Sequence, residues 1–288
     1  MLGEAGATVY CTGRSVRGAP HPSGPYAGRP ETIEDTADLV TAAGGEGVVV
    51  RVDFEVEDQV RSLFDRVRRE RGRLDVLVNV MSGNALASWD PFWKLSCSEG
   101  RAFYDSWVWK HLCACRHAAP IMIEQKSGLI VEVTEGETLS VTPHLYWDLV
   151  KVSLARSVLV MAEQLAEYGV TAVAVTPGYL RSEYALDHHG VSESNWRDAG
   201  KRDRYFLYSE TPCFIGRAVA ALAADLRVNE KSGRLFGSWT LSDEYGFTDI
   251  DGARPHWGRS VGAEVAAMAS RQTNVDWKIT TCTNGEEL

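Results

Sequence analysis

Short apolar runs alternate with amphipathic stretches along most of the chain. The apolar runs are rich in β-branched residues and predict strands over residues 7–13, 48–53, 74–79, 129–134, 170–176 and 234–238. Between them, apolar residues recur at helical spacing and predict helices over residues 31–43, 56–67, 98–125, 147–168 and 211–224. This alternation predicts an α/β fold with a doubly wound parallel sheet, helices on both faces, and ligands bound at the carboxyl ends of the strands.

The chain shows no internal repeat and no second region of alternating elements. We therefore expect a single domain over residues 1–239, in which a long loop follows the strand that ends at residue 176. After residue 239 the sequence becomes polar and loses its periodicity. This change predicts an irregular carboxy-terminal extension over residues 240–288.

Composition narrows the classes of function. A formal net charge of −9 argues against a nucleic-acid partner, because such surfaces need clustered Lys and Arg side chains. The longest apolar runs fall well short of the roughly 20 residues that span a bilayer, so we expect no membrane partner. Six cysteines in 288 residues, without a secretory leader, are typical of reduced thiols. These features predict a cytoplasmic protein.

The order of these units and the residues at several junctions resemble the short-chain dehydrogenase/reductase (SDR) family over residues 6–238, nearest its dehydrogenase/reductase member 1-like group. The resemblance implies a Rossmann-type, three-layer αβα fold. Pro177-Gly178 matches the family's Pro-Gly turn, and Ser182 stands where the family contacts the nicotinamide carboxamide. Asp53 stands where the family has an adenine-contacting acid, and Asn79 where it has a residue beside the nucleotide ribose.

Arg14 follows the first predicted strand and resembles the residue found in NADP-preferring members of the family. A guanidinium at this position can hold a 2′-phosphate, whereas an acid would hold the free ribose hydroxyl. The resemblance therefore implies NADP rather than NAD as the cofactor. The spacing alone fits an exposed arginine in a polar loop equally well.

The amino end departs from the family pattern. Residues 1–6 match only the close of the family's first helix, so the first strand and the glycine-rich phosphate loop are missing. The first strand is central, and its loss leaves two neighbouring strands with unpaired backbone groups. Three explanations remain: the recorded start is roughly 20 to 25 residues late, the two neighbouring strands pair directly, or another segment fills the gap.

The catalytic centre departs as well. The family uses a Tyr hydroxyl as its general acid/base, with a Lys four residues later. Lys151 is present, but Trp147 stands in the tyrosine position, and an indole N–H cannot cycle a proton near neutral pH. Tyr146 is one residue early, about 100° round the helix, so its use needs a local shift of register.

The family's serine position falls on Thr134 or Glu135, depending on the alignment by one residue. Thr134 can still donate a hydrogen bond. Glu135 would put a carboxylate beside Lys151, and such a pair perturbs both pKa values, as in acid/base chemistry. An ordinary exposed loop acid explains Glu135 equally well. Trp107 stands where the family has a helix asparagine that supports a proton relay, so the relay is expected to be absent.

A run of His and Cys residues, from His111 to His117, has the composition of a metal site. On a helix, residues 111 and 115 share one face, and residues 113 and 117 lie nearly opposite. One tetrahedral ion cannot collect all four side chains, so we expect no metal.

Three functions remain open. The first is an atypical NADP(H)-type oxidoreductase that acts on a small carbonyl or alcohol metabolite, with Lys151 and Tyr146 as the remaining catalytic candidates. The second is a non-redox lyase, isomerase or cyclase that uses Glu135 with Lys151 in a cleft lined by Trp107 and Trp147. The third is a catalytically inactive partner that dimerises through the helix beginning near Trp147. That helix commonly builds the interface in this family, which implies a homodimer or homotetramer.

Overall fold

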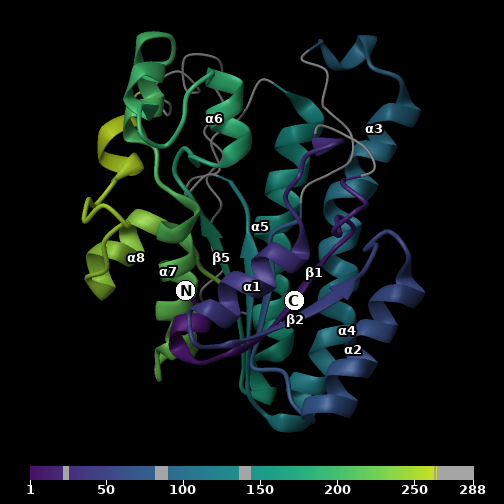
Figure 1. The fold of residues 1–288 in the computed structure, drawn as a ribbon. Coiled ribbons are helices and arrows are strands. Elements are labelled where there is room, and N and C mark those ends of the chain that lie inside the picture. The colour runs from purple at the N-terminus through teal and green to yellow at the C-terminus, as the bar shows by residue number, and fades with distance from the viewer. Residues whose placement is uncertain (22–25, 82–89, 136–143, 263, 265–288) are drawn as a thin grey trace, which may run out of the picture.

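The computed structural model describes residues 1–21, 26–81, 90–135, 144–262 and 264, whose strands form two parallel sheets. The smaller sheet pairs β1 (Thr8–Gly13) with β2 (Glu46–Arg51). The larger sheet has the order β3-β4-β5-β6, with bounds Val76–Asn79, Gly128–Val133, Val170–Thr176 and Leu235–Gly237. Helices lie around these strands in the αβα layering that the sequence predicted (Figure 1).

The predicted helices are present, with ends shifted by a few residues. The α-helices of the described residues are α1 (Ile33–Ala42), α2 (Glu57–Arg71), α3 (Cys97–Tyr104), α4 (Lys110–Gln125), α5 (Leu145–Leu165), α6 (Glu183–His189), α7 (Pro212–Ala224) and α8 (Ser238–Tyr245). A π-helical segment, Asp105–Trp109, joins α3 to α4 within the single helix predicted over 98–125. None of the described helices combines the length and apolarity needed to span a bilayer.

Two stretches predicted to be irregular contain regular elements. The predicted long loop holds α6 and two 3₁₀ helices, Trp196–Lys201 and Arg204–Tyr208. Trp196 and Phe206 from these 3₁₀ helices are buried in one small cluster, although the polar residues around them hide any periodicity in the sequence. Similarly, α8 extends into the predicted carboxy-terminal extension and buries Leu241.

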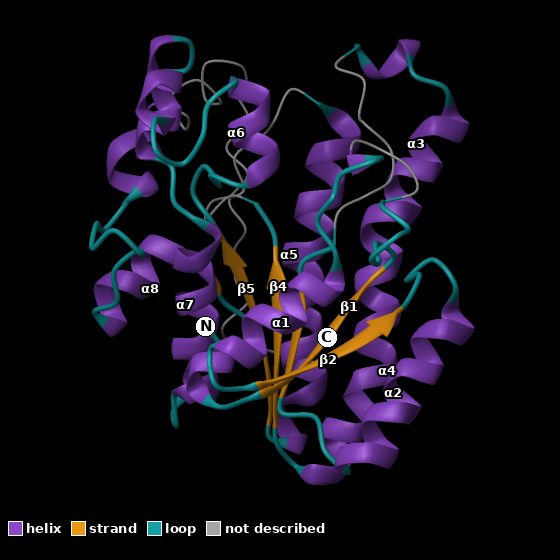
Figure 2. Ribbon diagram, in the orientation of Figure 1, coloured by secondary structure: helices purple, strands orange, loops and turns teal. Residues whose placement is uncertain are grey.

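The described strands form two sheets with no strand pair between them. β1 and β2 pair from Thr8 opposite Glu46 to Gly13 opposite Arg51. Among the described strands, β3 pairs only with β4. Direct pairing of β1 with β3, one of the three explanations for the missing strand, is therefore wrong. Figure 2 shows β1 and β2 inclined to the strands of the larger sheet.

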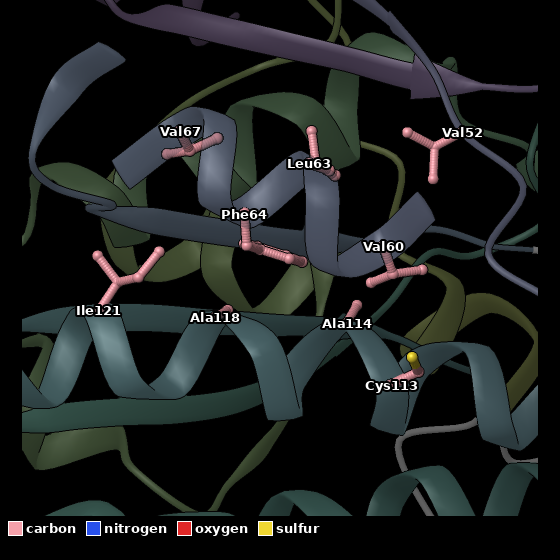
Figure 3. Close-up of a cluster of buried hydrophobic side chains, with 9 residues drawn as sticks. All are labelled: Val52, Val60, Leu63, Phe64, Val67, Cys113, Ala114, Ala118 and Ile121. Carbon is pink, nitrogen blue, oxygen red and sulfur yellow. The ribbon is translucent and has the colours of Figure 1, made fainter. Parts of the chain in front are cut away.

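A buried cluster between α2 and α4 connects the two sheets. Side chains of α2 face small and aliphatic side chains of α4, as Figure 3 shows for Val60, Leu63, Phe64, Val67, Ala114, Ala118 and Ile121. Tyr10 of β1, Val50 of β2 and Leu77 of β3 pack against this cluster. The hydrophobic core is thus continuous across the division in hydrogen bonding.

β4 and β5 are buried on both faces, as is typical of parallel strands between two helical layers. One face packs against α7 and α8 through Leu129, Val131, Val173 and Val175, and the other packs against α4 and α5 through Ile130, Ala172 and Ala174. Every residue of β5 is buried. These two strands therefore hold the residues at their carboxyl ends in fixed positions.

Candidate active site

The carboxyl ends of β4 and β5 bring several of the predicted site residues to one edge of the larger sheet. Thr134 and Glu135 follow β4 directly, and Pro177 and Gly178 follow β5 directly. The two strands are parallel neighbours, so the residues that follow them emerge side by side. Lys151 approaches this edge from α5, which packs against β5.

The ammonium group of Lys151 is enclosed by one carboxylate and two indole rings. Its Nζ lies 3.6 Å from Oε2 of Glu135, and 4.8 and 4.6 Å from the ring centroids of Trp107 and Trp147. Both rings are within the range of a cation–π interaction. Only 16% of the Lys151 side chain is exposed. This burial lowers the pKa of Lys151, and the Glu135 carboxylate opposes the shift without cancelling it.

Trp147 holds Glu135 in place. Its Nε1 donates a hydrogen bond of 2.8 Å to Oε2 of Glu135. The indole meets that of Trp107 edge to face, with centroids 5.0 Å apart. His144 caps α5 by accepting the backbone N–H of Trp147 at Nδ1, which fixes the first turn of the helix. Trp147, which stands in the family's tyrosine position, therefore orients a carboxylate, and its indole N–H does not ionise near neutral pH.

Tyr146 packs against α3. A Cβ atom placed on Gly100 would overlap the phenol ring of Tyr146, so the ring fills the notch that this glycine leaves. Lys151 lies five positions after Tyr146, which corresponds to about 140° round a helix. Because α5 is helical from Leu145 onward, the shift of register that would bring Tyr146 to Lys151 is absent.

Of the two residues proposed for the serine position, Glu135 is the one that contacts Lys151. The backbone N–H of Thr134 donates to the carbonyl oxygen of Val175, and its side chain is buried. Thr134 Oγ1 has no hydrogen-bond partner among the described residues. The Glu135 side chain is 56% exposed, so it links the enclosed ammonium group to water.

Asn79 ends β3 with its side chain in a buried polar network. Nδ2 lies 2.5 Å from Oε1 of Glu132 and 3.3 Å from Sγ of Cys115. His111 contributes Nδ1, 2.5 Å from Oε2 of Glu132, and Nε2, 3.1 Å from the carbonyl oxygen of Met81. The Asn79 amide, expected beside a ribose, is thus engaged with the protein interior. Sequence reasoning missed this role of Glu132, because a single acid inside an apolar strand forms no pattern.

The His and Cys residues of α4 are divided between opposite sides of the helix. Cys115 shares Glu132 with His111, and burial raises the pKa of the Cys115 thiol well above its ordinary value. Cys113 instead belongs to the cluster between α2 and α4, and His117 lies 3.3 Å from Glu57. In the part of the chain that the structure describes, no group of three or more His, Cys, Asp or Glu side chains is arranged to hold a metal ion.

Arg14 and Asp53 lie at the carboxyl end of the smaller sheet. Arg14 follows β1 directly, and its Nη2 lies 3.1 Å from Nε2 of His21. Asp53 lies two residues beyond β2, and its Oδ1 accepts the backbone N–H of Glu55 at 3.0 Å. Because β1 and β2 are paired in parallel, Arg14 and Asp53 follow the carboxyl ends of neighbouring strands.

The Pro177-Gly178 turn is fixed from behind by a residue that the sequence did not indicate. The Gly178 N–H donates to Oε2 of Glu210 at 2.9 Å. Ser182, four residues after Gly178, caps α6 by accepting the backbone N–H of Ala185 at 3.3 Å. Glu210 was missed because it lies 32 residues from Gly178, in a stretch predicted to precede a helix.

Comparisons with known proteins identify the family of this chain. A family model described as enoyl-(acyl carrier protein) reductase matches residues 26–228. Dehydrogenase/reductase SDR family member 1 of Homo sapiens is 30% identical over 262 residues, which cover 88% of this chain and 78% of that protein. The chain belongs to the short-chain dehydrogenase/reductase family. A short chain dehydrogenase of Pseudocercospora fijiensis is 24% identical over 243 residues, covering 80% of this chain and 72% of that protein.

Solved structures of SDR proteins share the fold. A short chain dehydrogenase from Mycobacterium thermoresistibile has a TM-score of 0.70 at 18% identity, covering 89% of this chain and 85% of that one. A metagenomic short-chain oxidoreductase in complex with NADP has a TM-score of 0.58 at 21% identity, covering 82% and 86%. These likenesses agree with the αβα fold of this SDR chain.

The donor set suits the two ends of a nicotinamide dinucleotide. At the smaller sheet, the Arg14 guanidinium can pair with a 2′-phosphate, and the Asp53 carboxylate can accept from an adenine amine. At the larger sheet, the Ser182 hydroxyl keeps its proton for donation because it acts only as an acceptor in the α6 cap. The Lys151 ammonium group can donate to ribose hydroxyls beside the same edge.

Proposed function

We propose that this SDR protein is an NADP(H)-dependent oxidoreductase of a small carbonyl or alcohol metabolite, in which Glu135 and Lys151 replace the family's Tyr–Lys pair. The observation that carries the proposal is the enclosed ammonium group of Lys151, 3.6 Å from a carboxylate that is itself held by Trp147. Paired groups of opposite charge at a strand end, one of them with a shifted pKa, are typical of acid/base sites.

The chemistry divides between the cofactor and the protein. When bound, NADPH supplies the hydride for the carbonyl carbon. Lys151 donates the proton for the carbonyl oxygen from Nζ, because its lowered pKa makes the ammonium group a better acid than an exposed lysine. The Glu135 carboxylate, whose side chain is exposed, then accepts a proton from water and passes it to the neutral amine of Lys151, which restores the ammonium group and the carboxylate.

The two tryptophans stabilise the charge of Lys151 and the position of Glu135. Cation–π contacts from Trp107 and Trp147 stabilise the charged form of Lys151 in a buried place. The Trp147 N–H fixes one oxygen of Glu135. Arg14, Asp53 and the Pro177-Gly178 turn with Ser182 are the proposed cofactor contacts, and Asn79 contributes through its backbone because its amide is engaged elsewhere.

A second candidate is a non-redox lyase, isomerase or cyclase built on the same pair. Its support is that Glu135 and Lys151 form a proton-transfer pair without needing a cofactor, beside two indoles that can stack on an aromatic or cationic intermediate. In this reaction class, Glu135 moves a proton between substrate carbons or oxygens, and NADPH has no part.

The direct experiment is a titration of the purified chain with NADPH and with NADH, followed by energy transfer from tryptophan to the reduced nicotinamide. The expected result is saturable binding of NADPH, tighter than that of NADH, with turnover on some member of a panel of small aldehydes and ketones. Absence of binding of both nucleotides would contradict the redox proposal and favour the second candidate. Binding without turnover would favour a catalytically inactive partner.

We also propose that the chain forms a homodimer or homotetramer through α5. Leu145, Leu149 and Val152 are exposed on this helix at the spacing of a single stripe, and Trp109 is exposed at the end of the π-helical segment. Light scattering after size exclusion should give at least twice the chain mass. Leu149→Glu should shift the equilibrium toward the monomer, and an unchanged mass for this variant would contradict the α5 interface.

The proposed compartment is the cytoplasm. The described cysteines, Cys11, Cys97, Cys113, Cys115 and Cys213, are free thiols, which fits a reducing environment.

A further inference from the structure

Glu210 is a buried acid directly behind the Pro177-Gly178 turn, and only 1% of it is exposed. Its backbone N–H donates to the carbonyl oxygen of Tyr179 at 2.9 Å, and its own carbonyl oxygen accepts the N–H of Arg181 at 2.7 Å. The main chain around Glu210 is therefore bonded to the segment that leads from the turn to Ser182.

The side chain of Glu210 adds a second connection. Oε2 accepts two hydrogen bonds, from the Gly178 N–H at 2.9 Å and from Ser238 Oγ at 2.6 Å. Ser238 starts α8, so one oxygen atom joins the turn after β5 to the helix after β6. Oε1 is buried and has no hydrogen-bond partner among the described residues.

The turn is held from its other side by Trp257. A Cβ atom on residue 178 would lie 3.0 Å from Cβ of Trp257 and 3.2 Å from Oε2 of Glu210. Only glycine fits between the two side chains without a shift of one of them. The position of Gly178 is therefore determined by groups outside its own strand.

A buried carboxyl group is costly, and no hydrogen bond or ion pair described for Glu210 comes from a cation. Burial raises the pKa of Glu210 to about 7, the nearby Asp249 adds to the shift, and the Ser238 and Gly178 donors oppose it. An apolar side chain of similar size would avoid this cost, but it would leave the Gly178 N–H and the Ser238 hydroxyl without an acceptor. The acid at 210 is thus explained by its contacts to the turn.

We infer that Glu210 is a positioning residue for the cofactor. It fixes the position of the Gly178 N–H directly. Through the main chain from Tyr179 to Ser182, it also fixes the groups that contact the nicotinamide end. The inference rests on the proposed function, because it assigns NADP(H) to this edge. Glu210 touches neither cofactor nor substrate, and it acts through the turn.

Two variants of Glu210 test whether its role depends on the hydrogen-bond acceptor rather than on the negative charge or the volume of the side chain. Glu210→Gln keeps a carbonyl oxygen that can accept from Gly178 and Ser238. Glu210→Met keeps the volume and removes the acceptor. If the methionine variant does not fold, Glu210→Asp replaces it, because its carboxylate is one methylene too short to reach the Gly178 N–H. Glu244→Gln on α8, which loses only a pair with Lys231, is the matched control.

The first measurement is hydrogen exchange of the Gly178 amide in the protein without nucleotide. We expect exchange to accelerate at least about tenfold in Glu210→Met and to stay within about threefold of the wild type in Glu210→Gln and in the control. The second measurement is the Kd for NADPH together with kcat and KM. We expect the methionine variant to raise the Kd and the KM for NADPH at least about tenfold, with a smaller loss of kcat.

The outcomes distinguish this inference from the proposed function. Unchanged Gly178 exchange in the methionine variant would overturn the positioning role, even if NADPH binds the wild type. Faster exchange with an unchanged Kd for NADPH would overturn the link to the cofactor. If the wild type binds no NADPH, the proposed function fails and the link to the cofactor fails with it, while the exchange data still decide whether Glu210 holds the turn.

Discussion

At the scale of single residues, the site depends on a carboxylate and an ammonium group that meet in an aromatic enclosure. Glu135 contacts Lys151 and is held by the indole of Trp147. Because Glu135 is half-exposed and Lys151 is enclosed, the proposed mechanism takes its protons from water through the carboxylate. The two residues therefore have different roles, and removing the charge of Glu135, which is no proposed cofactor contact, should affect the rate more than the binding of nucleotide.

We expect Glu135→Gln to lower kcat by about 10²- to 10⁴-fold, the usual contribution of a general acid/base group, and to leave the Kd for NADPH within about threefold. Steady-state kinetics and nucleotide titration measure the two effects separately. Glu124→Gln, at an exposed position of α4, serves as the control. An unchanged kcat for Glu135→Gln would remove this carboxylate from the mechanism.

Glu210 should make folding stability depend on pH. Its pKa is about 7 in the folded protein and 4.5 in an exposed carboxyl group, so the folded state retains the proton over this interval and the unfolded state does not. Stability should therefore fall as the pH rises from about 4.5 to about 7, by on the order of 3 kcal/mol from this group. Urea melts across this range measure the slope, and Glu210→Gln should flatten it. An equal slope in the variant would show that other groups are responsible.

Sequence reasoning at this scale identified residues that stand directly after strands, and it missed residues whose role comes from a distant partner. Glu135 and Lys151 were both singled out, because they align with the serine and lysine positions of the family that the sequence resembles. Glu132 and Glu210 were not, since each acts on a partner far along the chain. The proposed cofactor contacts, Arg14 among them, remain predictions.

At the scale of elements, α3 and α5 fit together through a notch. The phenol ring of Tyr146 occupies the space above Gly100, so this contact sets the distance between the two helices. It also fixes the Tyr146 ring against α3, so we expect Tyr146 to have no part in proton transfer. The sequence could place both residues on helices, but it could not show that a glycine on one helix receives a ring from the other.

We expect Gly100→Ala to destabilise the protein by about 1–3 kcal/mol, because the added methyl group overlaps the Tyr146 ring in a packed interface. Thermal or urea unfolding measures the loss. Tyr146→Ala should relieve it, so the double variant should be less unstable than the sum of the single effects. Tyr146→Phe should keep kcat within about twofold, and a large fall in kcat for this variant would restore Tyr146 as a catalytic candidate.

Elements with a long, regular pattern were predicted well. The strands and the amphipathic helices appear with small shifts at their ends, because their periodicity reflects burial on one or two faces. Short elements were missed: α6, α8 and the two 3₁₀ helices after β5 are only five to eight residues long, too short for a pattern to establish itself.

At the scale of the whole molecule, the division of the sheet is the main departure from a continuous doubly wound sheet. The alternation of strands and helices predicted the layers, and the resemblance pointed to a missing central strand. It left open how the neighbouring strands would respond, since their pairing depends on tertiary geometry. The hydrogen bonds divide into two sheets, whereas the cluster between α2 and α4 keeps the core continuous.

We expect the two sheets to differ in local stability. Amides of β5, which is buried at every residue and paired on both sides, should exchange most slowly. Amides of β1 and β2 should exchange faster, because this sheet has two strands and several partly exposed positions. Hydrogen exchange followed by mass spectrometry compares residues 8–13 and 46–51 with residues 170–176. Equal protection of the two sheets would show that they open as one unit.

Under the proposed function, the divided sheet would give the bound dinucleotide a mechanical role. Its proposed adenosine contacts belong to one sheet and its proposed nicotinamide contacts to the other, with no strand pairing described between them. A molecule that binds to both sheets at once would restrict their motion relative to each other. Occupancy and rigidity then rise together, so the cell's supply of cofactor would govern how stiff the catalytic edge is, as well as how often it reacts.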